Sequence, residues 1–239
     1  MSLWNHITHI REVNYEFKSC WYVVGIMLIM GPILIMGVWI AGLVPDTANV
    51  SPSESMTTVL AEKTQAEIGS MLQIFGVIAM CTGLYFLARS LKSDNAVSNQ
   101  FAEIGGLLLL LVVPIWVVFM GSWTEAIQAA EDFGNDVGTT ILASSTMFEA
   151  GGVLLIVGLF LLGISLTILK KYKGVIGALF IIASVCAFTD VIFDIEAVAI
   201  IGWMGMFLMT LIVGILTTLQ KENQKEDIPN RGVEEIPEA

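Results

Sequence analysis

The sequence predicts an all-α polytopic membrane protein, with six transmembrane helices built as three similar helical hairpins. Of its 239 residues, 56% are hydrophobic and only 14% are charged, and the mean hydropathy is +0.80. Soluble chains usually carry about 25% charged residues, so this chain has too little polar surface to cover a soluble core. The other two observations are a set of long apolar stretches and an internal repeat.

Six apolar stretches contain no Lys or Arg, and each is close to the roughly 20 residues that a helix needs to span a bilayer. In lipid the backbone must satisfy its own hydrogen bonds, and long runs without alternation favour helices over barrel strands. The predicted spans are 21–44, 68–88, 104–122, 150–169, 174–193 and 197–219.

The two ends of the chain differ from the spans. In residues 1–20, Leu3, Ile7, Ile10 and other apolar residues recur at helical spacing, which predicts an amphipathic N-terminal helix on the cytoplasmic membrane surface. Residues 221–239 are charged and contain two prolines, which is typical of a disordered tail.

A repeat relates the first four spans. Shifted by 82 residues, the segment 57–80 matches 139–162 without gaps at 10 of 24 positions, and Pro32 and Ile33 fall on Pro114 and Ile115. We therefore predict a first hairpin at 21–92, a second at 93–173 and a third, weaker copy at 174–220. The repeats run in the same direction, unlike the inverted repeats of many transporters.

The long connections also have helical character. Segments 55–66 and 139–148 contain good helix formers, and 124–133 has apolar residues at helical spacing. We expect these segments to form helices that project beyond the membrane, interrupted at Pro45, at Pro52 and around Gly134.

The basic residues predict the orientation. Ten of the 11 fall on the face that holds both termini, and only Lys63 falls on the other, which places both termini in the cytoplasm of a cell-membrane protein. The outer face then carries twelve acids and one base, a net charge of −11. Such a face disfavours nucleic acid and attracts cations.

Five of the outer carboxylates are candidate ligands for a hard cation or protons. Glu67, Glu149 and Glu196 each stand where an even-numbered span begins, and Asp190 and Asp194 share a helix face close to Glu196. Carboxylates at the membrane can form a cation site. The alternative is that each Glu marks the water boundary, near the positive N-terminal end of its helix.

Nothing in the sequence predicts an enzyme or a cofactor. No histidine and no lysine lies within a span, and no nucleotide-binding, hydrolase or zinc motif is present. The leading hypothesis is a non-enzymatic accessory or assembly subunit of a membrane complex, partnered by the lipid bilayer and by another membrane protein or a second copy. The alternative is a small cation or proton channel or transporter, with the five carboxylates as its outer vestibule.

Overall fold

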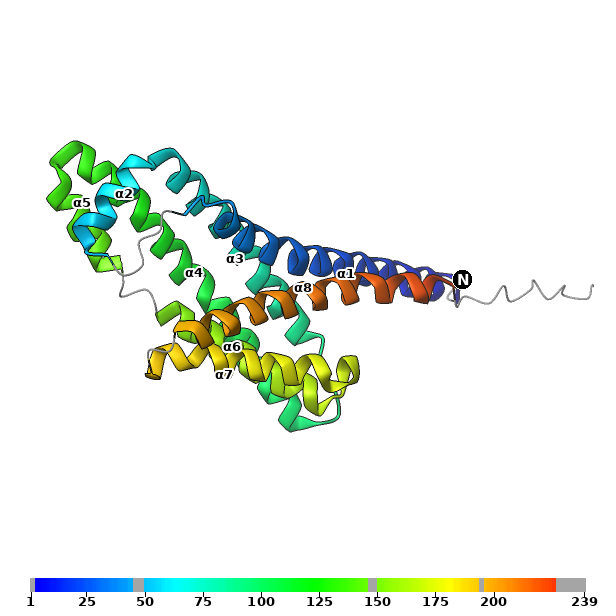
Figure 1. Cartoon of the computed structure of the whole chain (residues 1–239). Coiled ribbons are helices and arrows are strands. Elements are labelled where there is room, and N and C mark those ends of the chain that lie inside the picture. The colour runs from blue at the N-terminus through cyan, green and yellow to red at the C-terminus, as the bar shows by residue number, and fades with distance from the viewer. Residues whose placement is uncertain (1–2, 45–49, 146–149, 194–195, 227–239) are drawn as a thin grey trace, which may run out of the picture.

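The computed structural model describes residues 3–44, 50–145, 150–193 and 196–226, which form helices and no strand (Figure 1). Six helices, α1, α3, α4, α6, α7 and α8, are long and apolar enough to cross a membrane, as the sequence predicts. The elements are α1 (Leu3–Ile40), α2 (Pro52–Ala61), α3 (Lys63–Arg89), α4 (Ala96–Phe133), α5 (Asn135–Ser145), α6 (Ala150–Ile168), the short 3₁₀ turn η2 (Lys171–Gly174), α7 (Val175–Phe193) and α8 (Glu196–Glu226).

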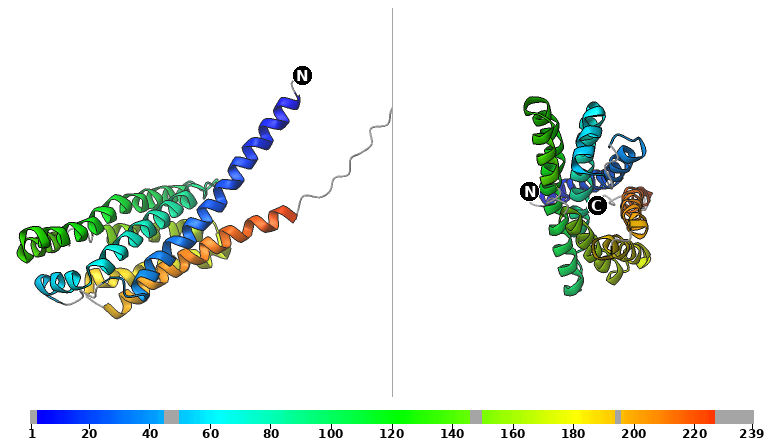
Figure 2. Two further views of the ribbon diagram at one scale, coloured as in Figure 1. Left: turned by 90° about the horizontal axis from the view of Figure 1, so that it is seen from above. Right: turned by 60° about the vertical axis from the view of Figure 1, so that its left-hand side comes forward.

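The six long helices form a ring in chain order. Each packs against the long helices before and after it, and α8 packs back on α1 to close the ring, an order that can be followed in the right view of Figure 2. We call the end where α1 begins and α8 ends the terminal end. The opposite end, which carries α2 and α5, is the distal end (Figure 1).

The interior of the ring is filled by large apolar side chains. Leu84, Leu109, Leu162 and Phe180 are completely buried and belong to one cluster that draws on α1, α3, α4, α6, α7 and α8. Side chains that alternate with them, such as Ile182, face outward and are exposed. An apolar exterior of this kind is what a lipid-facing bundle presents.

A glycine lies at each interface between neighbouring helices of the ring, and we call such an interface a seam. A Cβ added at Gly76 would stand 3.1 Å from the Gly31 carbonyl oxygen, and one at Gly158 would stand 3.1 Å from that of Gly105. The seam partners are Gly31 with Gly76 (α1–α3), Gly106 with Ala88 (α3–α4), Gly105 with Gly158 (α4–α6), Gly163 with Gly177 (α6–α7), Gly202 with Ala183 (α7–α8) and Gly214 with Leu28 (α8–α1). The helices therefore approach backbone to backbone, as small residues allow in membrane bundles.

A separate helical module, which we call the distal module, is built from α2, α5 and the distal ends of α3 and α4. Its own apolar cluster joins Met56, Val59, Ile127 and Leu142, all buried, with Trp123 packed against it. The connections are helical as predicted, but the segment 55–66 is divided between α2 and α3, and residues 146–148 of the segment 139–148 lie outside the described residues. Gly134, at φ 100°, makes the turn between α4 and α5. α4 continues past Trp123 to Phe133 without a break.

Toward the two ends of the described chain, the first and last helices of the ring, α1 and α8, continue beyond the predicted spans. α1 runs without a break from Leu3 to Ile40, so the predicted N-terminal helix joins the first span directly. α8 extends to Glu226, past residue 221, where the sequence predicts the tail to begin. Surface attachment of the N-terminal helix, the duplication of the hairpins and the cytoplasmic location of the termini stay predictions.

Glycine packing between α1 and α8 can be tested with a matched pair of variants. A Cβ at Gly214 would stand 2.9 Å from backbone atoms of Leu28 and Ile29, whereas one at Gly37 would meet nothing within 4 Å. Overpacking costs about 1–3 kcal/mol, while Gly→Ala in an open helix position gains up to about 1 kcal/mol. We expect G214A to lower the Tm in detergent, and G37A to leave it unchanged or raise it. Equal Tm values would contradict the close contact.

Candidate functional site

Glu67 is the one predicted cation ligand whose side chain the structure describes. It lies in the second turn of α3, half-buried at the distal end. Asp190 lies near the distal end of α7 and Glu196 begins α8, but their side chains lie outside the described part. Glu149 and Asp194 lie outside the described residues altogether. The cation site formed by these five carboxylates therefore stays a prediction.

Glu67 lies close to an ion pair between Lys63 and Glu131. The Lys63 Nζ lies 2.7 Å from a carboxylate oxygen of Glu131 on α4, and Glu67 and Asp132 add their negative charges to the surroundings of the same ammonium. In the described part of the chain, no three His, Cys, Asp or Glu side chains come together as a metal would need. The pair is half-exposed, so it orients α3 against α4 and adds little stability.

A capping box fixes the start of α2 in the distal module. The Ser51 backbone N–H donates to Glu54 Oε2 at 2.9 Å and its hydroxyl donates to the same oxygen at 2.8 Å, while the Glu54 N–H donates back to Ser51 Oγ at 3.4 Å. These hydrogen bonds lower the pKa of the Glu54 carboxyl from its ordinary value. The reciprocal pair satisfies two free donors of the helix N-terminus.

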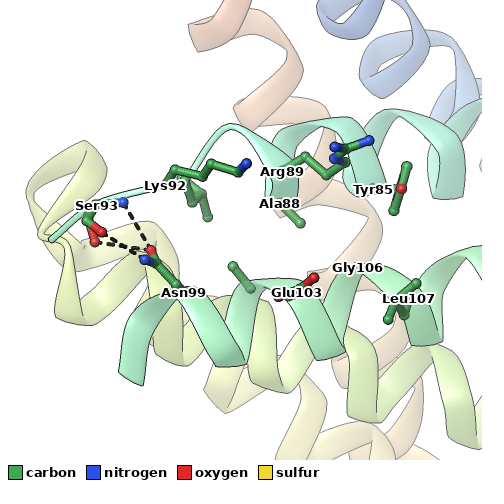
Figure 3. Close-up of a pocket in the computed structure, with 11 residues that line it drawn as sticks. Tyr85, Ala88, Arg89, Lys92, Ser93, Asn99, Glu103, Gly106 and Leu107 are labelled. Carbon is green, nitrogen blue, oxygen red and sulfur yellow. Dashed lines mark hydrogen bonds between the residues drawn. The ribbon is translucent and has the colours of Figure 1, made fainter. Parts of the chain in front are cut away.

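A polar pocket of about 570 Å³ lies at the terminal end, where α3 turns into α4 (Figure 3). Arg89 and Lys92 bring two positive charges to its rim and Glu103 brings one negative charge. The Asn99 side chain closes the turn, because its Oδ1 accepts from the Ser93 N–H at 3.0 Å and its Nδ2 donates to the Ser93 carbonyl at 2.7 Å.

Two basic side chains and one carboxylate give this polar pocket a charged lining. The Arg89 guanidinium lies 5.9 Å from the centre of the Tyr85 ring, a cation–π distance that keeps it beside the helix. Basic side chains between helix ends at this level can contact anionic lipid headgroups. Sequence reasoning used Arg89 and Lys92 only to orient the chain.

A second pocket, of about 400 Å³, is almost entirely apolar and lies in the distal half of the ring; we call it the distal groove. Its exposed rim includes Trp39 of α1 and Met204 of α8, and its floor includes the buried Met80, Val112 and Leu155. Sequence reasoning missed this groove because it depends on the pairing of the first helix with the last, which no local pattern reports.

These features, six apolar helices with an apolar exterior and with the described ion pair and basic pocket at the two ends, fit the class of multi-pass membrane proteins. Comparison of the chain with protein-family models, with curated proteins and with solved structures finds no match in any of the three.

The capping box predicts a pH-dependent effect of Glu54. Because the pKa of Glu54 is lowered in the folded chain, its contribution is present above the ordinary carboxyl pKa and is lost as the pH falls through the lowered pKa. We expect E54Q to lower the Tm slightly near neutral pH and to match the parent in acid. E62Q is the control, since Glu62 makes no side-chain cap hydrogen bond. A difference for E54Q that persists unchanged in acid would contradict this role.

Proposed function

We propose that the chain is a non-enzymatic accessory or assembly subunit of a membrane complex, and that the distal module binds its partner. The observation that carries this proposal is the module itself, which has an apolar cluster of its own outside the helix ring. α4 passes without interruption from the ring into the module. A partner bound to the module would therefore be held in a fixed position relative to the membrane.

The turn between α4 and α5 is the best-exposed part of the module. Phe133 is 76% exposed and Val137 is 40% exposed, and the exposed Asp132 and Asp136 stand beside them. Aromatic residues are enriched at the centres of protein interfaces, and polar residues at their rims. This arrangement favours a partner that offers an apolar pocket with basic residues around it.

Packing of the ring argues against the alternative, a cation path through its centre. Buried hydroxyl groups in the described core are already used: Ser98 and Ser165 lie 2.9 Å apart, and the Thr210 and Thr217 hydroxyls donate to carbonyls one turn earlier in α8. The remaining core cluster is made of leucine, valine, isoleucine, methionine, alanine, phenylalanine and one cysteine. Ion paths are normally lined by carbonyls, charged side chains or water.

A co-purification experiment tests the subunit role. The full chain is extracted from its native membrane in mild detergent, and the stoichiometry of bound proteins is measured. We expect a stoichiometric partner whose recovery falls about tenfold or more in F133S/D136N, since loss of an interface anchor costs about 2 kcal/mol or more. The matched control is V97S/D94N, which alters an exposed apolar residue and an exposed acid at the terminal end.

Two outcomes would contradict the subunit role. One is a clean homomer with no other protein bound, and the other is equal loss of the partner from the two double variants. A homomer would favour the alternative function, a cation path with the outer carboxylates as its vestibule.

Flux measurements test the alternative directly. We expect vesicles that contain the purified chain to pass K⁺, Na⁺ and H⁺ no faster than empty vesicles, because the described core offers no polar path. The variant E67Q/E149Q/D190N/D194N/E196Q should behave in the same way. Cation flux in the parent that this variant abolishes would establish the channel or transporter and reject our proposal.

A further inference from the structure

The polar pocket at the terminal end lies where the apolar runs of two long helices end. Arg89 is the last residue of α3 and the first basic residue after Lys63, and Glu103 stands directly before the apolar run that α4 carries into the ring. A helix that crosses a bilayer meets the lipid headgroups where its apolar run ends. The charged side chains of this pocket are therefore at the level of the headgroups.

The polar pocket has a buried floor and an exposed, charged rim. Ala88 and Ala102 line it and are each 3% exposed, whereas Arg89, Lys92 and Glu103 line it and are exposed. Figure 3 shows the two basic side chains on the α3 side of the pocket and the carboxylate across from them on α4. The volume of about 570 Å³ falls within the roughly 300–1,000 Å³ of small-molecule sites.

The turn that carries Lys92 is fixed on both sides. Asn99 of α4 makes hydrogen bonds to the backbone N–H and to the carbonyl of Ser93, at 3.0 and 2.7 Å. On the other side of Lys92, the Leu91 side chain is 3% exposed and belongs to the core cluster. The backbone at Lys92 is thus in place before any ligand binds, which lowers the entropy cost of binding.

The three charges of the pocket do not pair with one another. The one ion pair among the described residues joins Lys63 to Glu131 at the distal end, so Arg89, Lys92 and Glu103 share a pocket without a salt bridge between them. A guanidinium and an ammonium can share one phosphate group, which the guanidinium binds with two parallel hydrogen bonds. The carboxylate then remains for a positive group of the same ligand.

Exposed leucines lead from the charged rim along one face of α4. Leu107 lines the pocket one turn after Glu103 and is 50% exposed, and Leu111, one turn further, is 54% exposed. Residues four positions apart in a helix share a face. A hydrocarbon chain attached to a charged group at Glu103 would therefore lie along these leucines. A phosphate compound without such a chain would leave them uncovered, so the arrangement favours a lipid.

We propose that the polar pocket binds the headgroup of one phosphatidylethanolamine molecule. Arg89 and Lys92 bind its phosphate, Glu103 binds its ammonium group, and one acyl chain lies along Leu107 and Leu111. The chemistry recognised is a phosphate diester joined by two carbons to a primary amine and carried on hydrocarbon chains. The pocket and the distal module lie at opposite ends of the bundle, so this proposal stands or falls independently of the protein partner.

The experiment measures the Kd of each probe for the delipidated full chain in detergent by native mass spectrometry. The probes are dioleoyl phosphatidylethanolamine, dioleoyl phosphatidylglycerol, which has the same chains and phosphate but no amine, and O-phosphoethanolamine, which is the headgroup without chains. We expect the parent to bind phosphatidylethanolamine about tenfold more tightly than phosphatidylglycerol, since only the former has a partner for the carboxylate. O-phosphoethanolamine should bind much more weakly than either lipid.

Two variants assign the two halves of the headgroup. R89Q/K92Q removes both partners of the phosphate, and we expect it to weaken the binding of phosphatidylethanolamine about tenfold or more. E103Q removes the partner of the amine, and we expect it to bind phosphatidylethanolamine no more tightly than phosphatidylglycerol. All three positions are exposed, so the Tm of each variant without lipid should equal that of the parent.

Matched controls remove the same charges close by but outside the pocket. K170Q/K173Q removes two exposed lysines from the turn between α6 and α7 at the terminal end, and D94N removes an exposed acid from the turn between α3 and α4. None of these three residues lines the pocket. We expect both controls to bind the two lipids as the parent does.

Three results would overturn the proposal. The first is an affinity of the parent for phosphatidylglycerol that equals or exceeds its affinity for phosphatidylethanolamine. The second is a loss of affinity in R89Q/K92Q no larger than in K170Q/K173Q, which would show general attraction between basic residues and phosphate. The third is displacement of phosphatidylethanolamine by a similar concentration of O-phosphoethanolamine, which would assign the pocket to a water-soluble phosphate compound.

Discussion

Close contact between helix backbones is the constraint on which this structure depends. In lipid, burial of apolar surface does not drive helices together, because the surrounding chains are as apolar as leucine. Association must come from dense van der Waals contact, which requires backbones to approach. The glycine at each seam supplies that approach, and the carbonyl oxygens of Gly31 and Gly105 lie only 3.1 Å from where a Cβ on Gly76 or Gly158 would stand.

The functional features follow from where this close contact ends. Between α1 and α8 it holds only in the terminal half, so the distal half opens into a groove. The distal module rests on α3 and α4, the helices across the ring from α7 and α8. The distal groove and the apolar cluster of the distal module therefore lie in different parts of one bundle and share no lining residue.

Much of the fold could be predicted because its signals are local. Apolar runs of span length and helical spacing in the connections each depend on neighbouring residues, and the long helices, α2 and α5 were found in this way. Ring closure could not be predicted, since it joins Gly25 to Gly214 across most of the chain. The ion pair between Lys63 and Glu131 could not be predicted either, because the two residues are 68 positions apart in the sequence. The candidate carboxylates were found from their position, but charge alone does not tell a ligand from a boundary marker.

Hydrogen bonding distinguishes two kinds of buried polar side chain inside the ring. Ser and Thr in a helix can donate to the carbonyl one turn earlier, so burial leaves their hydroxyls paired, as the Thr210 hydroxyl donates to the Met206 carbonyl at 2.8 Å. Gln73 was visible in the sequence as one of few polar residues within the spans, yet the sequence gives no sign that its Nε2 is unpaired. A long amide or an indole has no such carbonyl on its own helix within easy reach, so its partner must come from another helix or from outside the chain. In the described part of the ring no helix offers that partner to Gln73 or Trp116. The hydroxyls of the ring are therefore satisfied within one helix, whereas the amide nitrogen of Gln73 and the indole nitrogen of Trp116 depend on packing between helices.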